Sequence, residues 1–106
     1  MGGGYRLGDF ERIVLLALVC LRENAYGVTI RREIEERAGR EVSYGALYTT
    51  LDRMEAKGYV SSRIGEPTQV RGGRAKRYFQ IEAPGIRALN ETRETIANMG
   101  GLVHVG

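Results

Sequence analysis

Residues Ser43–Glu82 read SYGALYTTLDRMEAKGYVSSRIGEPTQVRGGRAKRYFQIE, and this stretch decides the fold. Its first part predicts a helix, because the Ser43 hydroxyl can accept a hydrogen bond from a free backbone N–H one turn further on. The apolar side chains that follow at i, i+4 and i+7 share one helical face, and they are Leu47, Leu51 and Met54. Gly58 suits the left-handed backbone position just past the end of a helix. A helix is therefore expected to begin after Ser43 and to end before Gly58.

The second part of the stretch predicts a hairpin of two strands. Tyr59–Ile64 and Arg77–Ile81 are rich in β-branched and aromatic residues, which are typical of strands. Between them the segment Arg71–Arg77, RGGRAKR, places four cations around two glycines and contains no acid. A helix followed by a hairpin with a cationic tip has a shape that can enter a DNA groove and contact the neighbouring backbone. An ordinary α+β fragment with a solvated basic loop is the alternative.

The chain before this stretch predicts two more helices. Asp9 is expected to cap a first helix over Phe10–Arg22, in which every position from Ile13 to Leu21 is apolar. A helix that is apolar all round is typically buried on all sides, which is hard to achieve inside one small domain of 106 residues. One face is therefore expected to pack on the domain core and another on a partner subunit, with Cys20 buried.

A second helix is expected over Gly27–Ala38, with a stripe of Ile30, Ile34 and Ala38 and a stop at Gly39. Two helices joined by a short glycine-containing turn form a helix-turn-helix, and the following hairpin makes the winged form.

Pro84 is well placed for the first turn of a fourth helix that runs to about Met99. The expected fold class is α+β, mostly α: an arm over 1–8, a winged helix-turn-helix domain over 9–82, a C-terminal dimerisation helix over 83–99 and a tail over 100–106. The expected dimer interface combines the outer face of the first helix with the seam of the fourth, and its residues are Ile13, Leu16, Cys20, Ile86, Leu89, Arg93 and Ile96.

Two groups of residues are expected to contact DNA. In a helix-turn-helix, the N-terminal half of the second helix of the motif reaches base edges and phosphates. The expected contacts there are Ser43, Tyr44, Gly45, Tyr48, Thr49 and Arg53. The expected contacts in the wing, whose cations would repel one another without an anion nearby, are Arg71, Gly72, Gly73, Arg74, Lys76 and Arg77. For any one side chain of the helix, ordinary surface packing is the alternative.

Other function classes find little support in the sequence. The net charge of +3 is modest, so the distribution of charge matters more than its total. One cysteine excludes an internal disulfide, His104 is the sole histidine, and no Cys/His cluster has metal spacing, so neither a metal nor another cofactor is expected. No phosphate-binding loop or dinucleotide motif is present. The longest apolar run, Ile13–Leu21, is far shorter than the roughly 20 residues that span a bilayer, and a cytoplasmic location is expected. The chain is not expected to be an enzyme.

Three segments together resemble the PadR-like transcriptional regulators, which are winged helix-turn-helix proteins. Ala25-Tyr26-Gly27 leading into IRREI at 30–34 is similar to the opening of the family's second helix. Ser43–Val60 is similar to its recognition helix and helix stop, and Arg71–Phe79 is similar to its wing. The resemblance covers Leu7 to about Leu89, and the chain is similar to the short class that has a single C-terminal helix.

The resemblance implies a homodimeric repressor on an inverted-repeat operator, with the first and last helices forming the dimer. It also implies a response to phenolic acids or hydrophobic drugs, often at the dimer interface; the chain has no tryptophan to sandwich a flat ligand. Two alternatives stay open beside simple DNA binding. One is a winged-helix module that binds protein, and the other adds a small apolar effector at the dimer interface.

Overall fold

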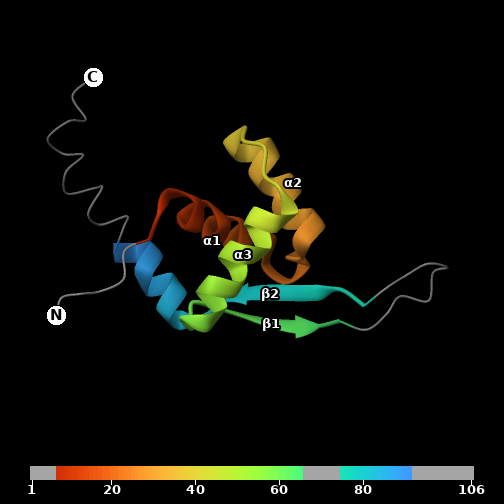
Figure 1. Ribbon diagram of the computed structural model, residues 1–106. Coiled ribbons are helices and arrows are strands. Elements are labelled where there is room, and N and C mark those ends of the chain that lie inside the picture. Colours follow the sequence, from red (N-terminus) through yellow and green to blue (C-terminus); the bar gives the residue numbers. More distant parts are fainter. Residues whose placement is uncertain (1–6, 66–74, 92–106) are drawn as a thin grey trace, which may run out of the picture.

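The computed structural model describes residues 7–65 and 75–91 of the chain. The elements in order are α1 (Asp9–Leu21), the short 3-10 helix η1 (Arg22–Asn24), α2 (Gly27–Ala38), α3 (Tyr44–Ala56), β1 (Val60–Ile64) and β2 (Arg77–Ile81). Residues 83–91 form a further helix. Three helices pack beside a two-stranded antiparallel hairpin (Figure 1), and this arrangement confirms the mostly α winged helix-turn-helix fold.

The helix ends of the central motif lie where the local sequence predicts them. The Ser43 hydroxyl accepts a hydrogen bond from the Ala46 backbone N–H at 3.1 Å. Gly39 ends α2 with φ 62°, and Gly58 follows α3 with φ 80°, both in the left-handed region that favours glycine. Local chemistry therefore decides both ends of the turn between the two helices.

The start of α1 differs from expectation by one residue. Gly8 and not Asp9 is the capping residue, and its backbone N–H donates to Glu11 Oε1 at 2.7 Å. Asp9 is the first helical residue and pairs with Arg12 at 3.3 Å. The Glu11 carboxylate reaches back to the backbone N–H of Gly8, as the acidic residue of a capping box does, and this contact places the helix start at Gly8 and not at Asp9.

The core draws apolar side chains from the three long helices and both strands. The side chains with relative exposure of 2% or less are Val14, Leu15, Leu18, Ala25, Ile30, Ile34, Leu47, Leu51, Met54, Val60 and Phe79. Leu47, Leu51 and Met54 all lie at 0%, which confirms the inward face of α3. The expected stripe on α2 ends at Ile34, because Ala38 lies in the last turn of the helix and is exposed.

One side of α1 is not covered by the described part of the chain. Leu16 is 43% exposed and Val19 46% exposed, and Cys20 is also exposed, so the expected burial of Cys20 is wrong for the single chain. The described residues supply one surface for α1 to pack against, and among them nothing covers the far side of the helix. Among the described residues, no helix is long and apolar enough to span a membrane.

The hairpin is joined to the start of α2 by its second strand. The register pairs Val60 with Ile81 and Ile64 with Arg77. On the other edge of β2, the Phe79 N–H donates to the Ala25 carbonyl at 2.9 Å, and Tyr26 and Tyr78 form an isolated bridge. The C-terminal end of β1 and the N-terminal end of β2 lie together and are called the open ends of the strands. They project away from α1 and from the helix over 83–91 (Figure 1).

Candidate nucleic-acid interface

The outer face of α3, together with its capping residue Ser43, carries most of the recognition-helix residues expected to contact DNA. Ser43, Gly45, Thr49 and Arg53 are exposed, and Tyr44 is 39% exposed. A Cβ added at Gly45 would meet no heavy atom of the chain within 4 Å. The protein's own packing does not require a glycine there, so the open backbone at Gly45 is free for close approach by another molecule.

Tyr44 is held by Arg31, an arginine that was not expected at this site. The Arg31 guanidinium lies 4.6 Å from the centre of the Tyr44 ring, its Nε donates to the Val42 carbonyl at 2.8 Å, and it pairs with Glu35 at 3.2 Å. A hydrogen bond with the Tyr44 side chain, followed by the charge of Glu35, raises the pKa of Arg31. The i, i+4 spacing of Arg31 and Glu35 was a usable signal, although the contact with Tyr44 requires the fold.

Tyr48 is half-buried and packs instead of projecting. Its ring lies 6.2 Å from that of Phe79 and 6.4 Å from that of Tyr44. Its hydroxyl lies beside Gly27, the first residue of α2, where an added Cβ would clash with it. The Tyr48 ring therefore connects α3 to both β2 and α2.

Arg53 has a partner within the chain. Its Nη1 lies 3.8 Å from Oε2 of Glu11, whose side chain is buried to 8% exposure. Arg53 lies in the last turn of α3, farthest of the expected helix contacts from Ser43, and its side chain reaches toward α1.

The described part of the wing carries cations stacked on tyrosines. Lys76 Nζ lies 4.5 Å from the centre of the Tyr26 ring, and the Arg63 guanidinium lies 4.8 Å from that of Tyr78. The two rings meet edge to face at 5.4 Å. Arg63 was not expected at this site, because its partner comes from the other strand. The remaining expected wing contacts, Arg71, Gly72, Gly73 and Arg74, lie outside the described residues.

Arg77 was expected to contact DNA from the wing, but its side chain is bonded to residues of its own chain. Its Nη2 donates to Asp52 Oδ1 at 3.0 Å and to Glu55 Oε1 at 2.7 Å, and its Nε donates to Ser62 Oγ at 3.2 Å. Burial lowers the pKa of Arg77, but the hydrogen bonds to Asp52 and Glu55 outweigh that effect and raise it. Arg77 therefore ties β2 to two carboxylates of α3.

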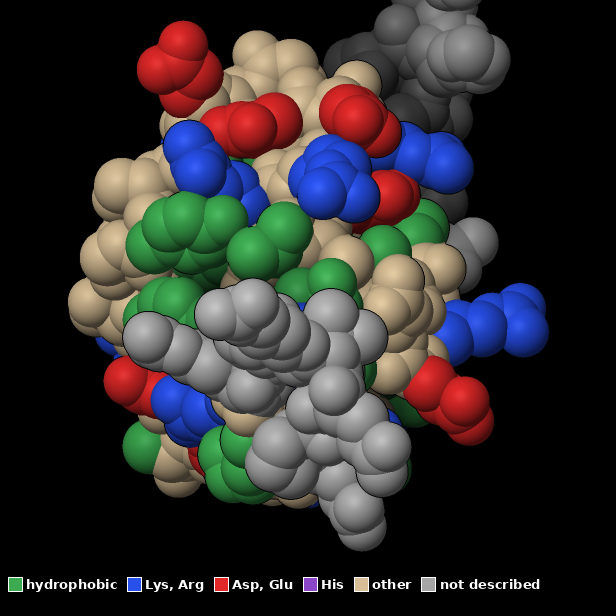
Figure 2. Space-filling model, turned by 90° about the vertical axis from the view of Figure 1, so that its right-hand side faces the viewer, with side chains coloured by type: hydrophobic (Ala, Val, Ile, Leu, Met, Phe, Trp, Pro, Cys, Tyr) green, Lys and Arg blue, Asp and Glu red, His purple; other side chains and the backbone are tan. Residues whose placement is uncertain are grey.

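The charge on the face around the hairpin is mixed. In the view onto the open ends of the strands, Lys and Arg side chains lie next to Asp and Glu side chains, with hydrophobic side chains between them (Figure 2). Within the described ranges, no group of three or more His, Cys, Asp or Glu side chains could hold a metal ion.

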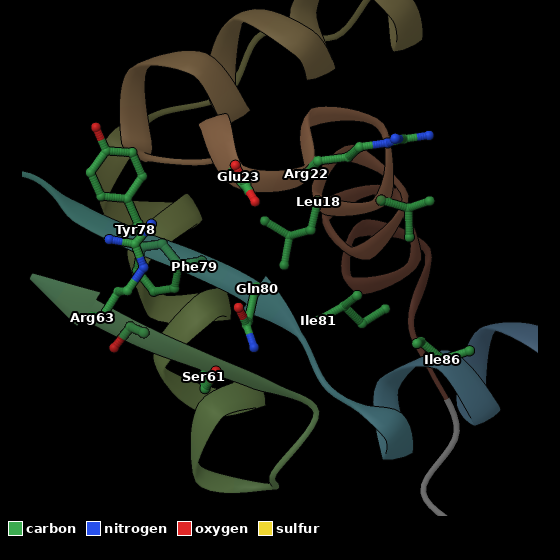
Figure 3. Close-up of a pocket in the computed structure, with 12 residues that line it drawn as sticks. Leu18, Arg22, Glu23, Ser61, Arg63, Tyr78, Phe79, Gln80, Ile81 and Ile86 are labelled. Carbon is green, nitrogen blue, oxygen red and sulfur yellow. The ribbon is translucent and has the colours of Figure 1, made fainter. Parts of the chain in front are cut away.

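A hollow of about 570 Å³ lies on another side of the hairpin. Leu18 of α1, Ile81 of β2 and Ile86 face it, and Arg22, Glu23 and Arg63 lie around it (Figure 3). The exposed Val19 also lines this hollow, which is therefore continuous with the uncovered face of α1.

The expected dimer residues fall into four groups. Leu16, Cys20 and Ile86 are exposed, and Ile13 is partly buried. Leu89 is 5% exposed within the core of its own chain, so it presents no side chain to a partner. Arg93 and Ile96 lie outside the described residues.

Comparisons with known proteins agree on one family. The model of the Transcriptional regulator PadR-like family matches residues 15–91. Transcriptional regulator Rv3488 of Mycobacterium tuberculosis is 35% identical over 74 residues, which cover 70% of this chain and 64% of that protein. The chain therefore matches less than two thirds of that relative's length.

Solved structures have the same fold. A PadR-like transcription factor from Bacteroides fragilis gives a TM-score of 0.74 at 26% identity, covering 92% of this chain and 89% of that one. A PadR family transcription regulator from Clostridium difficile gives 0.72 at 21% identity, covering 91% and 96%. The chain therefore belongs to the PadR-like family, whose members are transcriptional regulators and not enzymes.

Proposed function

We propose that this chain is a sequence-specific DNA-binding repressor that acts as a homodimer on an inverted-repeat operator. The observation that carries the proposal is the exposed N-terminal half of α3, held against the hairpin through Tyr48 and Phe79. In a winged helix-turn-helix this half of the helix lies in the major groove, and the wing contacts the flanking backbone. Because the proposed partner is duplex DNA, the proposed compartment is the cytoplasm.

The proposed base and phosphate contacts divide along α3 and the hairpin. Tyr44, Gly45 and Thr49 face outward near the start of α3, where Ser43 and the free N–H groups can bind a phosphate. Arg71, Arg74 and Lys76 supply charge from the wing. Tyr48 and Arg53 have contacts within the chain, so their proposed role is to hold the reading surface in place.

The dimer is proposed to form through the uncovered face of α1 and the helix that begins at residue 83. Leu16, Val19 and Ile86 are 43%, 46% and 46% exposed in the single chain. Large apolar side chains gathered on one side of a small domain favour burial against a second copy. A small apolar effector is proposed to bind at this interface, next to the hollow lined by Leu18 and Ile81.

The second candidate is a winged-helix module that binds protein and not a specific DNA sequence. It is favoured by the mixed charge on the face around the hairpin (Figure 2) and by the net charge of only +3.

Fluorescence anisotropy across a salt series separates the two functions. The test compares duplex DNA from upstream of the protein's own gene with a scrambled duplex of the same composition. If each subunit neutralises about three phosphates, log affinity is expected to fall with log salt with a slope of roughly −5 for a dimer, and upstream binding is expected to persist at salt that removes binding to the scrambled duplex. Equal and weak binding to both duplexes would favour the protein-binding module. Release of the upstream duplex by a phenolic acid would support the effector.

A further inference from the structure

A cluster of four side chains connects the hairpin to the far half of α3. Asp52 and Glu55 are three residues apart on the helix, and Arg77 on β2 reaches both carboxylates at 3.0 and 2.7 Å. Ser62 on β1 donates to both Glu55 oxygens, at 3.1 and 2.9 Å, and accepts from Arg77 Nε. Both strands of the hairpin are therefore bonded to Glu55, whereas an isolated ion pair would hold only one strand.

The cluster is partly shielded from water. The side chains of Arg77 and Glu55 are each 34% exposed, and the Arg77 guanidinium also lies 4.7 Å from the centre of the buried Phe79 ring. Exposed single ion pairs contribute little, typically about 0 to 1 kcal/mol. Here the planar guanidinium of Arg77 is held by three hydrogen bonds and by the Phe79 ring. These contacts fix its orientation relative to α3 and to both strands.

The same contacts make Arg77 a poor phosphate ligand. Its Nε and Nη2 already donate to Ser62 and to the two carboxylates. One arginine and two acids leave a local charge of −1, which repels a phosphate. Contacts with the DNA backbone are therefore left to the other wing cations, Arg71, Arg74 and Lys76, and to the start of α3.

We propose that Arg77, Asp52 and Glu55 are positioning residues that set the angle between the hairpin and α3, and that Arg77 does not bind phosphate. The inference rests on the proposed DNA-binding function. Specific binding requires α3 and the wing to contact the operator at the same time. The angle between them therefore contributes to the affinity for the operator and much less to the affinity for unrelated DNA.

The direction in which Glu55→Gln changes operator affinity distinguishes a positioning role from a purely electrostatic one. Glu55→Gln removes a negative charge, so electrostatic attraction alone predicts tighter DNA binding. The positioning role predicts that operator affinity falls by about tenfold, which corresponds to about 1.4 kcal/mol, while binding to scrambled duplex rises slightly. The matched control is Glu36→Gln, which removes the same charge from an exposed position on α2 and is expected to strengthen both slightly. Equal strengthening by both variants would overturn the proposal.

A salt series on Arg77→Met tests the phosphate alternative. If Arg77 positions the wing, affinity falls while the slope of log affinity against log salt stays that of the wild type. If it binds phosphate, the slope becomes less steep by about 0.9 per subunit. Arg77→Lys, which keeps the charge without the fork, is expected to recover only part of the lost specificity. Thermal unfolding of each variant establishes that it is folded.

The angle itself can be measured without DNA. Residual dipolar couplings of backbone amides in α3 and β2 report the relative orientation of the two elements in the free protein. A changed orientation is expected in Glu55→Gln and not in Glu36→Gln, and an unchanged orientation would overturn the positioning role. A wild-type protein that fails to discriminate the two duplexes would contradict the proposed DNA function, whereas the couplings would still decide the positioning claim.

Discussion

Gly85 and Gly45 are both helical, but their surroundings are opposite. A Cβ at Gly85 would clash with the Tyr59 carbonyl oxygen and Ile81, whereas one at Gly45 would meet only open space. The backbone of Tyr59 cannot move aside without disturbing the link between α3 and β1. We expect Gly85→Ala to lower the free energy of unfolding by about 1–3 kcal/mol, measured by urea denaturation.

Gly45→Ala is the matched control and is expected to raise stability by up to about 1 kcal/mol, because alanine suits a helix better than glycine. The same variant is expected to weaken operator binding, since the added methyl group lies on the proposed DNA face. A loss of stability in Gly45→Ala, or none in Gly85→Ala, would contradict this account of the two sites.

The Glu82 carboxylate makes part of the folding stability dependent on pH. A hydrogen bond from Ser61 at 2.5 Å, followed by one from Gln80 at 2.9 Å, lowers the pKa of Glu82. A lowered pKa in the folded state stabilises the protein above the ordinary glutamate pKa of about 4.3, and this contribution is lost as the pH falls through the folded value. We expect Ser61→Ala to raise the pKa of Glu82 in an NMR titration.

The stability deficit of Ser61→Ala is expected at neutral pH and should shrink below about pH 4, where glutamate becomes protonated in both proteins. Gln80→Ala should cause a smaller rise in the same pKa. A Glu82 titration that is the same in Ser61→Ala and wild type would show that the Ser61 hydroxyl does not act on this carboxylate.

Single residues were predictable from sequence where their partners are near in the chain. Ser43, Gly39 and Gly58 act on the backbone within one turn, so their residue types suffice. The partners of Arg77 lie 22 and 25 positions away on another element. The sequence shows Arg77 as one more cation of the wing, and only the folded chain brings it to Asp52 and Glu55.

At the scale of elements, residues 25–26 pair with the outer edge of β2, and this extra pairing is expected to make the hairpin more stable than two strands alone. An isolated two-stranded hairpin is marginal in water, but here the Phe79 N–H donates to Ala25 and Phe79 is 2% exposed. We expect the Phe79 amide to be among the slowest of the hairpin in NMR hydrogen exchange. Exchange as fast as in a surface loop would contradict the contact between β2 and residues 25–26.

The extents of elements were predictable where periodicity and stop signals agree. The bounds of α2 and β2 are those expected, Gly27–Ala38 and Arg77–Ile81. The apolar run of α1 predicted a helix, and the outer face expected for it included Leu16 and Cys20, which are exposed in the single chain. Leu89, expected on the same interface, is buried, because how much surface the rest of the domain offers is a property of the packed molecule and not of a helix pattern.

At the scale of the whole molecule, the uncovered face of α1 predicts self-association. We expect Leu16→Glu to shift the mass measured by sedimentation from dimer to monomer, because it places a charge in the proposed interface. Val28→Glu is the matched control, since Val28 and Leu16 are both 43% exposed and Val28 lies on α2. Equal masses for the two variants would show that this face of α1 does not form the dimer.

The helix that begins at residue 83 and the open ends of the hairpin lie on opposite sides of the chain (Figure 1). A substitution that damages DNA reading therefore need not disturb pairing of the chains. In a cell that makes both forms, a chain with a defective Thr49 or Lys76 would enter mixed dimers and spoil the intact partner, so the trait is expected to be dominant. A chain carrying Leu16→Glu would not pair at all, and its defect is expected to be recessive.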